Sequence, residues 1–227
     1  PPTPAAMPST RRAFLATCLA AGGVTAGCLG TGGPVAYRSY GYEAHNRGWH
    51  PRATGPGGVG VSPAWRFEAA TRRQTPAVAG GRLFVESRRR DRSILAALDV
   101  RSGEELWTYD AGESLGPRFS PAVADGTVYL ITTAGVVHAV RADDGTRVWR
   151  RRLGQPQGAM NSPVVADGAL VFGHGIQTVM AFHGLYALET ADGSTRWHRE
   201  PRTDSAAGEP RAHTPQFPAV HDGRVYY

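Results

Sequence analysis

The chain has 227 residues, of which 41% are hydrophobic, enough for a packed core in one or two domains. Its 29 glycines and 17 prolines favour many turns over long helices. The formal net charge is +6, and every basic residue is an arginine. Because these arginines are scattered, apart from runs at 88–92 and 150–152, and no nucleic-acid-binding motif accompanies them, we expect no nucleic-acid partner. We interpret them as a solvated surface that also keeps strand edges from pairing.

Residues 1–33 have the pattern of an export signal. Arg11 and Arg12 precede a weakly apolar run rich in alanine and glycine, as is typical of the twin-arginine route for folded proteins. The four residues that end at Cys28 resemble a lipobox, although Thr25 stands where leucine is usual. We therefore predict that Cys28 is lipidated and that the protein is anchored to the outer face of the cell membrane. Cleavage at another small residue, or retention of the segment as an uncleaved anchor, are the alternatives.

The remainder of the chain contains no cysteine, because both thiols, Cys18 and Cys28, lie in this leader. A disulfide scaffold, a cysteine zinc site and a cysteine nucleophile are therefore excluded beyond residue 33. Residues 34–60 are rich in glycine and polar residues, with three prolines, and are predicted to be a linker and an irregular lead-in.

From residue 61 onward the sequence repeats itself. An Ala-x-Asp-x-x-x-Gly-x-x-x-Trp phrase occurs three times, with Arg141 and Glu189 at the acidic position of the second and third copies. Its other positions are Ala97, Asp99, Gly103 and Trp107, then Ala139, Gly145 and Trp149, then Ala187, Gly193 and Trp197. Together with Trp65, the tryptophans are separated by 42, 42 and 48 residues. Such a period indicates one small unit that is stacked many times.

Each repeat is predicted to be a four-stranded antiparallel meander. In the second copy Asp125-Gly126 is a strong signal for a two-residue hairpin, and residues 127–132 are rich in β-branched and aromatic side chains. Residues 136–140 and 146–149 supply two further short strands, and no sustained helical stripe of apolar residues is present. A meander with two apolar faces cannot bury them alone, so we expect neighbouring units to cover them.

The spacing of the repeated phrase suggests a role for each residue. The glycine permits a tight turn, the alanine keeps the third strand thin, and the tryptophan packs against a neighbouring unit. Asp99 can accept hydrogen bonds from N–H groups in the turn, and we expect this bond to be lost or replaced at Arg141 and Glu189. The longer third interval comes from an insertion at residues 174–183.

The phrase resembles the tryptophan-docking motif of the PQQ-like (pyrroloquinoline-quinone-type) repeats. The resemblance implies an all-β fold, a β-propeller of four-stranded antiparallel blades. It places a closing strand with Trp65 at about 61–70, blades at about 75–117, 120–153 and 162–200, and the start of a further blade at 217–227. Because such propellers usually have seven or eight blades, we expect the chain to be an incomplete, N-terminal portion. The WD40 propeller is disfavoured, because Thr108, Arg150 and His198 follow the tryptophans where aspartate would be needed.

Three functions agree with this resemblance to different degrees. We favour a non-enzymatic, membrane-tethered scaffold outside the cytoplasm that binds a protein or a small ligand, as in the barrel-assembly lipoproteins of the family. The alternative is a dehydrogenase that uses pyrroloquinoline quinone with Ca²⁺, although no cluster of Ca²⁺ ligands and no catalytic residue is recognisable. An extracytoplasmic sensor or carbohydrate-binding module is the third. We therefore assign no catalytic, cofactor-binding or metal-binding residue, and interpret the histidines around the insertion as loop or surface residues. These are His174, His183, His198, His213 and His221.

Overall fold

The computed structural model describes residues 62–68, 75–89, 92–115, 120–153, 162–176, 181–200 and 218–226. Every regular element in these ranges is a β-strand. None of these residues forms a helix that is long and apolar enough to cross a bilayer.

The strands form three four-stranded antiparallel sheets, each a meander in chain order, and one two-stranded hairpin. Blade 1 consists of β1 (Ala77–Ala79), β2 (Arg82–Arg89), β3 (Arg92–Asp99) and β4 (Glu105–Asp110). Blade 2 consists of β5 (Ala122–Ala124), β6 (Thr127–Ile131), β7 (Val136–Arg141) and β8 (Arg147–Arg152). Blade 3 consists of β9 (Val164–Ala166), β10 (Ala169–Ile176), β11 (Ala181–Glu189) and β12 (Thr195–Arg199). The separate hairpin consists of β13 (Ala219–His221) and β14 (Arg224–Tyr226). The predicted all-β fold of four-stranded antiparallel blades is confirmed.

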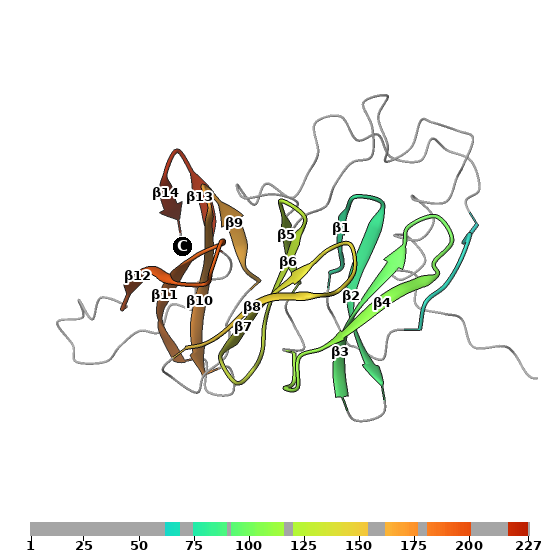
Figure 1. Cartoon of the computed structure of the whole chain (residues 1–227). Helices are drawn as coiled ribbons and strands as arrows, with labels where there is room; N and C mark the ends of the chain where they lie inside the picture. The colour runs from blue at the N-terminus through green and yellow to red at the C-terminus, as the bar shows by residue number, and fades with distance from the viewer. Residues whose placement is uncertain are drawn as a thin grey trace, which may run out of the picture.

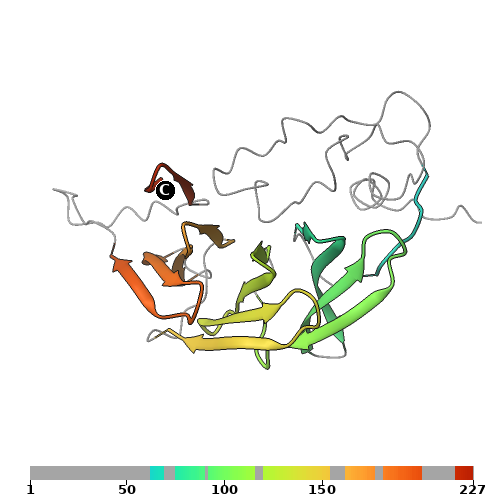
Figure 2. The ribbon, with the colours of Figure 1, turned by 45° about the horizontal axis from the view of Figure 1, so that its top comes forward.

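The blades stand side by side as a fan (Figure 1). The first strand of each sheet contacts the first strand of the next, from β1 to β5, from β5 to β9 and from β9 to β13. The last strands, β4, β8 and β12, lie on the opposite, outer side (Figure 2). Each blade is therefore arranged with its first strand nearest to a common axis and its fourth strand at the periphery, as in a propeller.

The first hairpin of each sheet turns on two residues with positive φ. In blade 2 these are Asp125 (φ 47°) and Gly126 (φ 70°), the residues for which the sequence predicts a two-residue turn. Asp167-Gly168 and Asp222-Gly223 repeat this conformation in the later sheets. Such turns match the right-handed twist of the paired strands, which explains why the Asp-Gly pair recurs at each of these positions.

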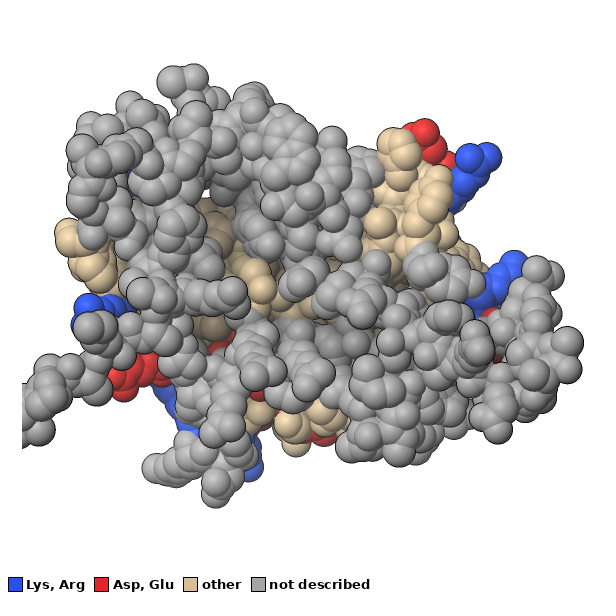
Figure 3. Space-filling view, turned by 180° about the vertical axis from the view of Figure 1, so that it is seen from behind, with Lys and Arg blue, Asp and Glu red and all other residues tan. Residues whose placement is uncertain are grey.

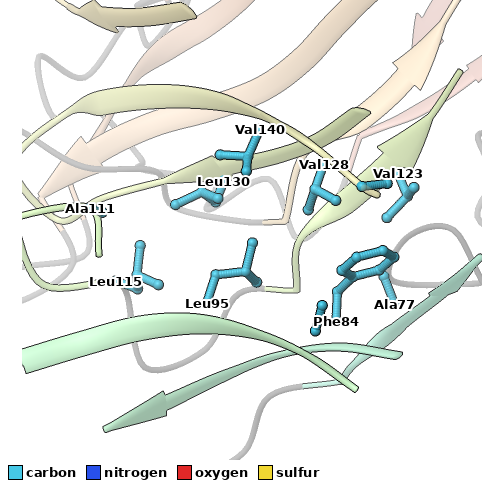
Figure 4. Packing of buried hydrophobic residues seen from close by; sticks show 11 residues of the cluster. Ala77, Phe84, Leu95, Ala111, Leu115, Val123, Val128, Leu130 and Val140 are labelled. Carbon is cyan, nitrogen blue, oxygen red and sulfur yellow. The ribbon is translucent and has the colours of Figure 1, made fainter. Parts of the chain in front are cut away.

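The hydrophobic core lies between the sheets. Phe84 and Leu95 of blade 1 point towards Val128 and Leu130 of blade 2, and all four side chains are buried (Figure 4). A second cluster joins blades 2 and 3, where Phe172 and Leu188 pack against the opposite face of the middle sheet. Since both faces of blade 2 are covered by its neighbours, its inner strands read as nearly continuous apolar runs.

Two segments differ from simple repetition. A closing strand is expected at 61–70. Its described part, 62–68, pairs with no strand among the described residues. The insertion at 174–183 lengthens the hairpin of β10 and β11, whose register shifts between His174 and Gly175. The remaining insertion residues, 177–180, lie outside the described part of the chain.

Candidate functional site

The repeated phrase creates one contact between blades, and that contact recurs three times. The indole N–H of Trp65 donates a hydrogen bond to the carbonyl oxygen of Val100 at 3.0 Å. Trp107 donates in the same way to Ala142 at 3.1 Å, and Trp149 to Thr190 at 2.9 Å. Each acceptor lies in the turn before the fourth strand of the next blade. Each of these three tryptophans therefore caps a turn of the neighbouring blade, Trp107 and Trp149 from the fourth strand of their own blade and Trp65 from a segment outside the strands.

The glycine of each turn lies directly beneath the indole ring. A Cβ atom on Gly103 would lie 2.5 Å from Trp65, one on Gly145 would lie 2.7 Å from Trp107, and one on Gly193 would lie 2.8 Å from Trp149. All three glycines also have φ between 73° and 75°, a conformation that side chains rarely adopt. Glycine is therefore required at each position for two reasons: the turn needs a positive φ, and the indole ring leaves no room for a Cβ atom.

The alanine of each phrase lies opposite the tryptophan of the same blade. Ala97 pairs with Trp107, Ala139 with Trp149, and Ala187 with Trp197 across the last two strands. These alanines are completely buried. A small side chain therefore stands beside the indole on the neighbouring strand in each blade.

The last tryptophan of the repeated phrase, Trp197, is partly buried against the cluster that joins blade 3 to Val220 of β13. Val225 of β14 packs on the same cluster. Blade 3 and the hairpin therefore share a hydrophobic core.

The turn keeps its backbone geometry while its side-chain hydrogen bonds change. Asp99 accepts hydrogen bonds from the N–H groups of Arg101 and Ser102, both at 2.8 Å, and these bonds hold the pKa of its carboxyl below the usual value. In the later blades a different carboxylate serves the turn. Asp144 accepts from Thr146 at 2.8 Å, and Asp192 accepts from Ser194 at 2.8 Å. In blade 1 the N–H that corresponds to that of Thr146 belongs to Glu104 and is bound by the hydroxyl of Ser102 at 3.2 Å, so Asp144 and Asp192 take the place of Ser102 and bind a different N–H from those bound by Asp99.

A polar cluster between blades 1 and 2 escaped the sequence analysis. The imidazole of His138 on β7 is completely buried, and its Nδ1 atom lies 2.9 Å from the hydroxyl of Tyr109 on β4. Its Nε2 atom lies 3.6 Å from Oε2 of Glu113. Glu113 in turn accepts hydrogen bonds from Arg150 at 2.7 Å and from Arg152 at 3.1 Å. The only sequence signal was a histidine inside the apolar run 136–140.

Burial keeps His138 neutral. Desolvation lowers its pKa from 6.5 to about 4, against the opposing attraction of Glu113. Burial also raises the pKa of Tyr109, so this hydroxyl stays protonated. We assign the O–H of Tyr109 as the donor to Nδ1, which leaves the proton of the neutral imidazole on Nε2, facing Glu113. Among the described residues, Nε2 of His138 and Oε2 of Glu113 have no partner within hydrogen-bond distance.

The cluster has the residue types of an acid–base relay but not the access. The imidazole is enclosed by two sheets, and the one carboxylate near it is already bound by two guanidinium groups. A general base needs to lie within hydrogen-bond reach of the proton that it removes. The arrangement therefore supports the packing of blades 1 and 2.

Within the described ranges, no group of three or more His, Cys, Asp or Glu side chains could hold a metal ion. The described residues therefore offer no ligand set for the Ca²⁺ that accompanies a quinone cofactor. Arg11, Arg12 and Cys28 lie outside the described residues, as do His213 and the side chains of His174 and His183.

Stacked four-stranded sheets, joined by indole rings that cap the turns of their neighbours, define a β-propeller of the tryptophan-docking class. The sequence matches the family described as outer membrane protein assembly factor BamB over residues 61–183, more than half of the chain. The chain belongs to this family of PQQ-like β-propellers, as its repeats predict. A comparison with curated proteins finds no match.

Solved structures support the same fold. The quinohemoprotein alcohol dehydrogenase ADHIIG of Pseudomonas putida HK5 is similar with a TM-score of 0.56 and 20% identity, covering 74% of this chain and 27% of the enzyme. The corresponding enzyme of Comamonas testosteroni gives 0.53 and 18%, covering 78% and 28%. A europium-containing methanol dehydrogenase gives 0.52 and 19%, covering 61% and 27%. The chain thus spans little more than a quarter of the length of these enzymes, and the likeness at this identity concerns the fold alone.

Proposed function

We propose that the protein is an exported, membrane-tethered propeller outside the cytoplasm, and that it acts as a non-enzymatic scaffold for a protein or small ligand. The observation that carries this proposal is the match of residues 61–183 to a family described by an assembly factor of the outer membrane. A scaffold of this kind needs a rigid body, and the repeated indole contacts between blades supply it.

The sequence of residues 1–33 agrees with a location outside the cytoplasm. The paired arginines and the lipobox-like Cys28 agree with a folded protein that is exported and then anchored by lipid.

Export is tested by fractionation of cells that produce the full chain with a C-terminal tag. The wild type should be found in the membrane fraction and be degraded by protease added to spheroplasts. The double variant Arg11→Lys, Arg12→Lys should remain inside the cell, because the twin-arginine route requires the arginine pair. Cys28→Ser should still leave the cytoplasm but should no longer take up radiolabelled palmitate. A protected, cytoplasmic wild-type protein would contradict the proposed location.

The scaffold function is tested by crosslinking in the intact envelope, followed by purification of the tagged protein. One defined envelope protein should be enriched from the wild type and not from a destabilised variant such as Trp149→Ala. The alternative function, that of a dehydrogenase, is tested by incubating the purified protein with pyrroloquinoline quinone and Ca²⁺ and assaying it with alcohols and a redox dye. Turnover in that assay would replace the scaffold proposal with the dehydrogenase.

A further inference from the structure

The outer strand of blade 2 carries an unusual charge. β8 has the sequence Arg-Val-Trp-Arg-Arg-Arg, so four of its six residues are arginines. All four are exposed, as is Val148, with 47% of its surface accessible. In the sheet, β8 pairs with β7 on one side and is the last strand on the other.

The positive charge of β8 exceeds the negative charge that contacts it. Arg150 and Arg152 share a single carboxylate, that of Glu113. Arg151 donates to the hydroxyl of Thr195, a neutral group, at 3.2 Å. In the part of the chain that the structure describes, two of the four guanidinium groups thus contact one carboxylate, and two have no direct ion pair.

The equivalent strands of the neighbouring blades carry less excess charge. On β4, Glu105 pairs with Arg89, and Asp110 pairs with Arg92 at 2.6 Å, so each carboxylate has its own arginine. On β12, Arg196 pairs with Glu189 at 2.7 Å, and Arg199 has no ion pair among the described residues. The excess of positive charge is therefore larger on β8 than on β4 or β12.

An edge strand offers backbone hydrogen bonds as well as side chains. Alternate residues of β8 direct their N–H and C=O groups away from β7, and such an edge can pair with another extended chain. Arginines on an edge oppose pairing with a second copy of the same strand, because like charges that lie opposite each other repel. They favour a strand of opposite charge for the same reason.

We propose that β8 is a docking edge for an extended acidic peptide, which would add to blade 2 as a fifth strand. Because successive side chains of a strand point to opposite faces, its carboxylates would lie beside Arg147 and Arg152 on the face towards blade 1, and its alternate apolar side chains would lie on the opposite face. By its sequence alone this arginine run indicates a solvated surface, whereas on a sheet edge it also fits an acidic strand. The inference deepens the scaffold function proposed above and rests on it for the existence of a protein partner.

The test uses the full chain purified in detergent and a fluorescein-labelled nine-residue peptide in which Glu alternates with Val. Fluorescence anisotropy should show saturable binding that weakens with added salt. The variant Arg147→Gln, Arg152→Gln should weaken binding at least tenfold. The matched variant Arg196→Gln, Arg199→Gln removes the same charge from β12 and should change the affinity less than twofold.

Two control peptides separate strand addition from attraction of charge alone. A peptide with Lys in place of Glu should not bind. A peptide that keeps its glutamates but carries a central proline should bind at least tenfold more weakly, because proline lacks the N–H that a ladder needs. On addition of the Glu peptide, hydrogen exchange of the β8 amides should slow, whereas the amides of β4 and β12 should not change.

Several outcomes would overturn the inference. Equal binding of the proline peptide, unchanged exchange at β8, or binding only to vesicles with anionic phosphatidylglycerol would each do so. Association of the chain with itself through β8 would also contradict it. If the peptide fails to bind but the crosslinked envelope partner is still captured by Arg147→Gln, Arg152→Gln, this inference falls and the scaffold function stands. If neither the peptide nor the envelope partner binds, both the docking edge and the scaffold function are contradicted.

Discussion

The two interfaces of blade 2 use the same contact near the turn and different contacts further out. Towards blade 1, Trp107 caps a turn of blade 2, and the outer part contains the buried cluster of Tyr109 and His138. Towards blade 3, Trp149 caps the next turn, and the outer part contains Arg151 bound to Thr195. The position of His138 is occupied in blade 3 by Tyr186, which stacks on His198 with ring centroids 4.2 Å apart.

This difference separates what the architecture requires from what varies between repeats. The indole, the glycine beneath it and the alanine opposite it recur because a ring between two sheets leaves little room for other residues. The residues in the outer parts of the interfaces can vary more, since hydrogen bonds, ion pairs or stacked rings can each fill that space. In the rear space-filling view, described arginines lie at the margins and some adjoin acidic side chains (Figure 3), which fits such local pairing.

Removal of a docking tryptophan is expected to have the largest effect. Trp149→Ala should lower the free energy of unfolding by about 3–5 kcal/mol, because a large ring is lost and a cavity remains. Trp149→Phe keeps an aromatic ring and loses the hydrogen bond to Thr190, so its cost should be only about 1–2 kcal/mol. Urea unfolding monitored by circular dichroism measures both values. Near-wild-type stability of the alanine variant would mean that the ring does not pack between blades.

The glycine beneath the ring gives the second prediction, with a control in the same blade. In Gly145→Ala, a new Cβ would clash with Trp107 and sit at φ 75°, so the variant should lose about 2–5 kcal/mol. Gly126→Ala has φ 70° but no atom within 4 Å of the new Cβ, and should lose only about 1–2 kcal/mol. Both values come from the same unfolding experiment. Equal costs would show that backbone conformation alone, without ring contact, selects glycine here.

The buried histidine makes one interface sensitive to pH. The pKa of His138 is about 4 in the folded protein and near 6.5 when unfolded, so between these values the unfolded state binds more protons. Stability should therefore be complete above pH 6.5, fall as the pH decreases towards 4, and level off below that. The total loss should be up to about 3 kcal/mol.

The matched variant is His138→Gln, in which the titrating ring is absent. The difference between the two stability profiles isolates His138 from the carboxylates, which titrate in both proteins. The charged groups that face the imidazole, Glu113 from the loop after β4 and Arg147 and Arg150 from β8, remain in both. Parallel profiles between pH 4 and 6.5 would contradict a buried, neutral histidine.

The smallest effect is expected in the turns. Asp99→Ala should lower the free energy of unfolding by about 1 kcal/mol, because two backbone N–H groups lose their acceptor at an exposed site. Arg141→Ala changes the corresponding residue of the next repeat, where Asp144 serves the turn, and should change stability by less than about 0.5 kcal/mol. Thermal unfolding of the two variants distinguishes them. A larger cost at Arg141 would show that the turns do not divide their hydrogen bonds in this way.

Local patterns in the sequence were sufficient to predict the strands and turns. Asp125-Gly126 predicted a hairpin because its turn needs positive φ at both residues, and the structure has that turn. The acidic position was harder, because Asp144, three residues after Arg141, binds the N–H of Thr146 and not the N–H groups that correspond to those bound by Asp99. The His138 cluster was missed because Tyr109 and His138 are 29 residues apart and lie in different repeats. No local pattern brings them together.

The sequence by itself determined the repeating unit and its all-β character, since alternation of side chains, turn propensities and a fixed period act over a few residues. Only the tertiary structure decided which turn each indole caps, that His138 is buried, and that the arginines of β8 lie on a sheet edge. These features depend on the distance between residues that belong to different sheets. The packing of one blade on the next sets that distance, and no single repeat contains it.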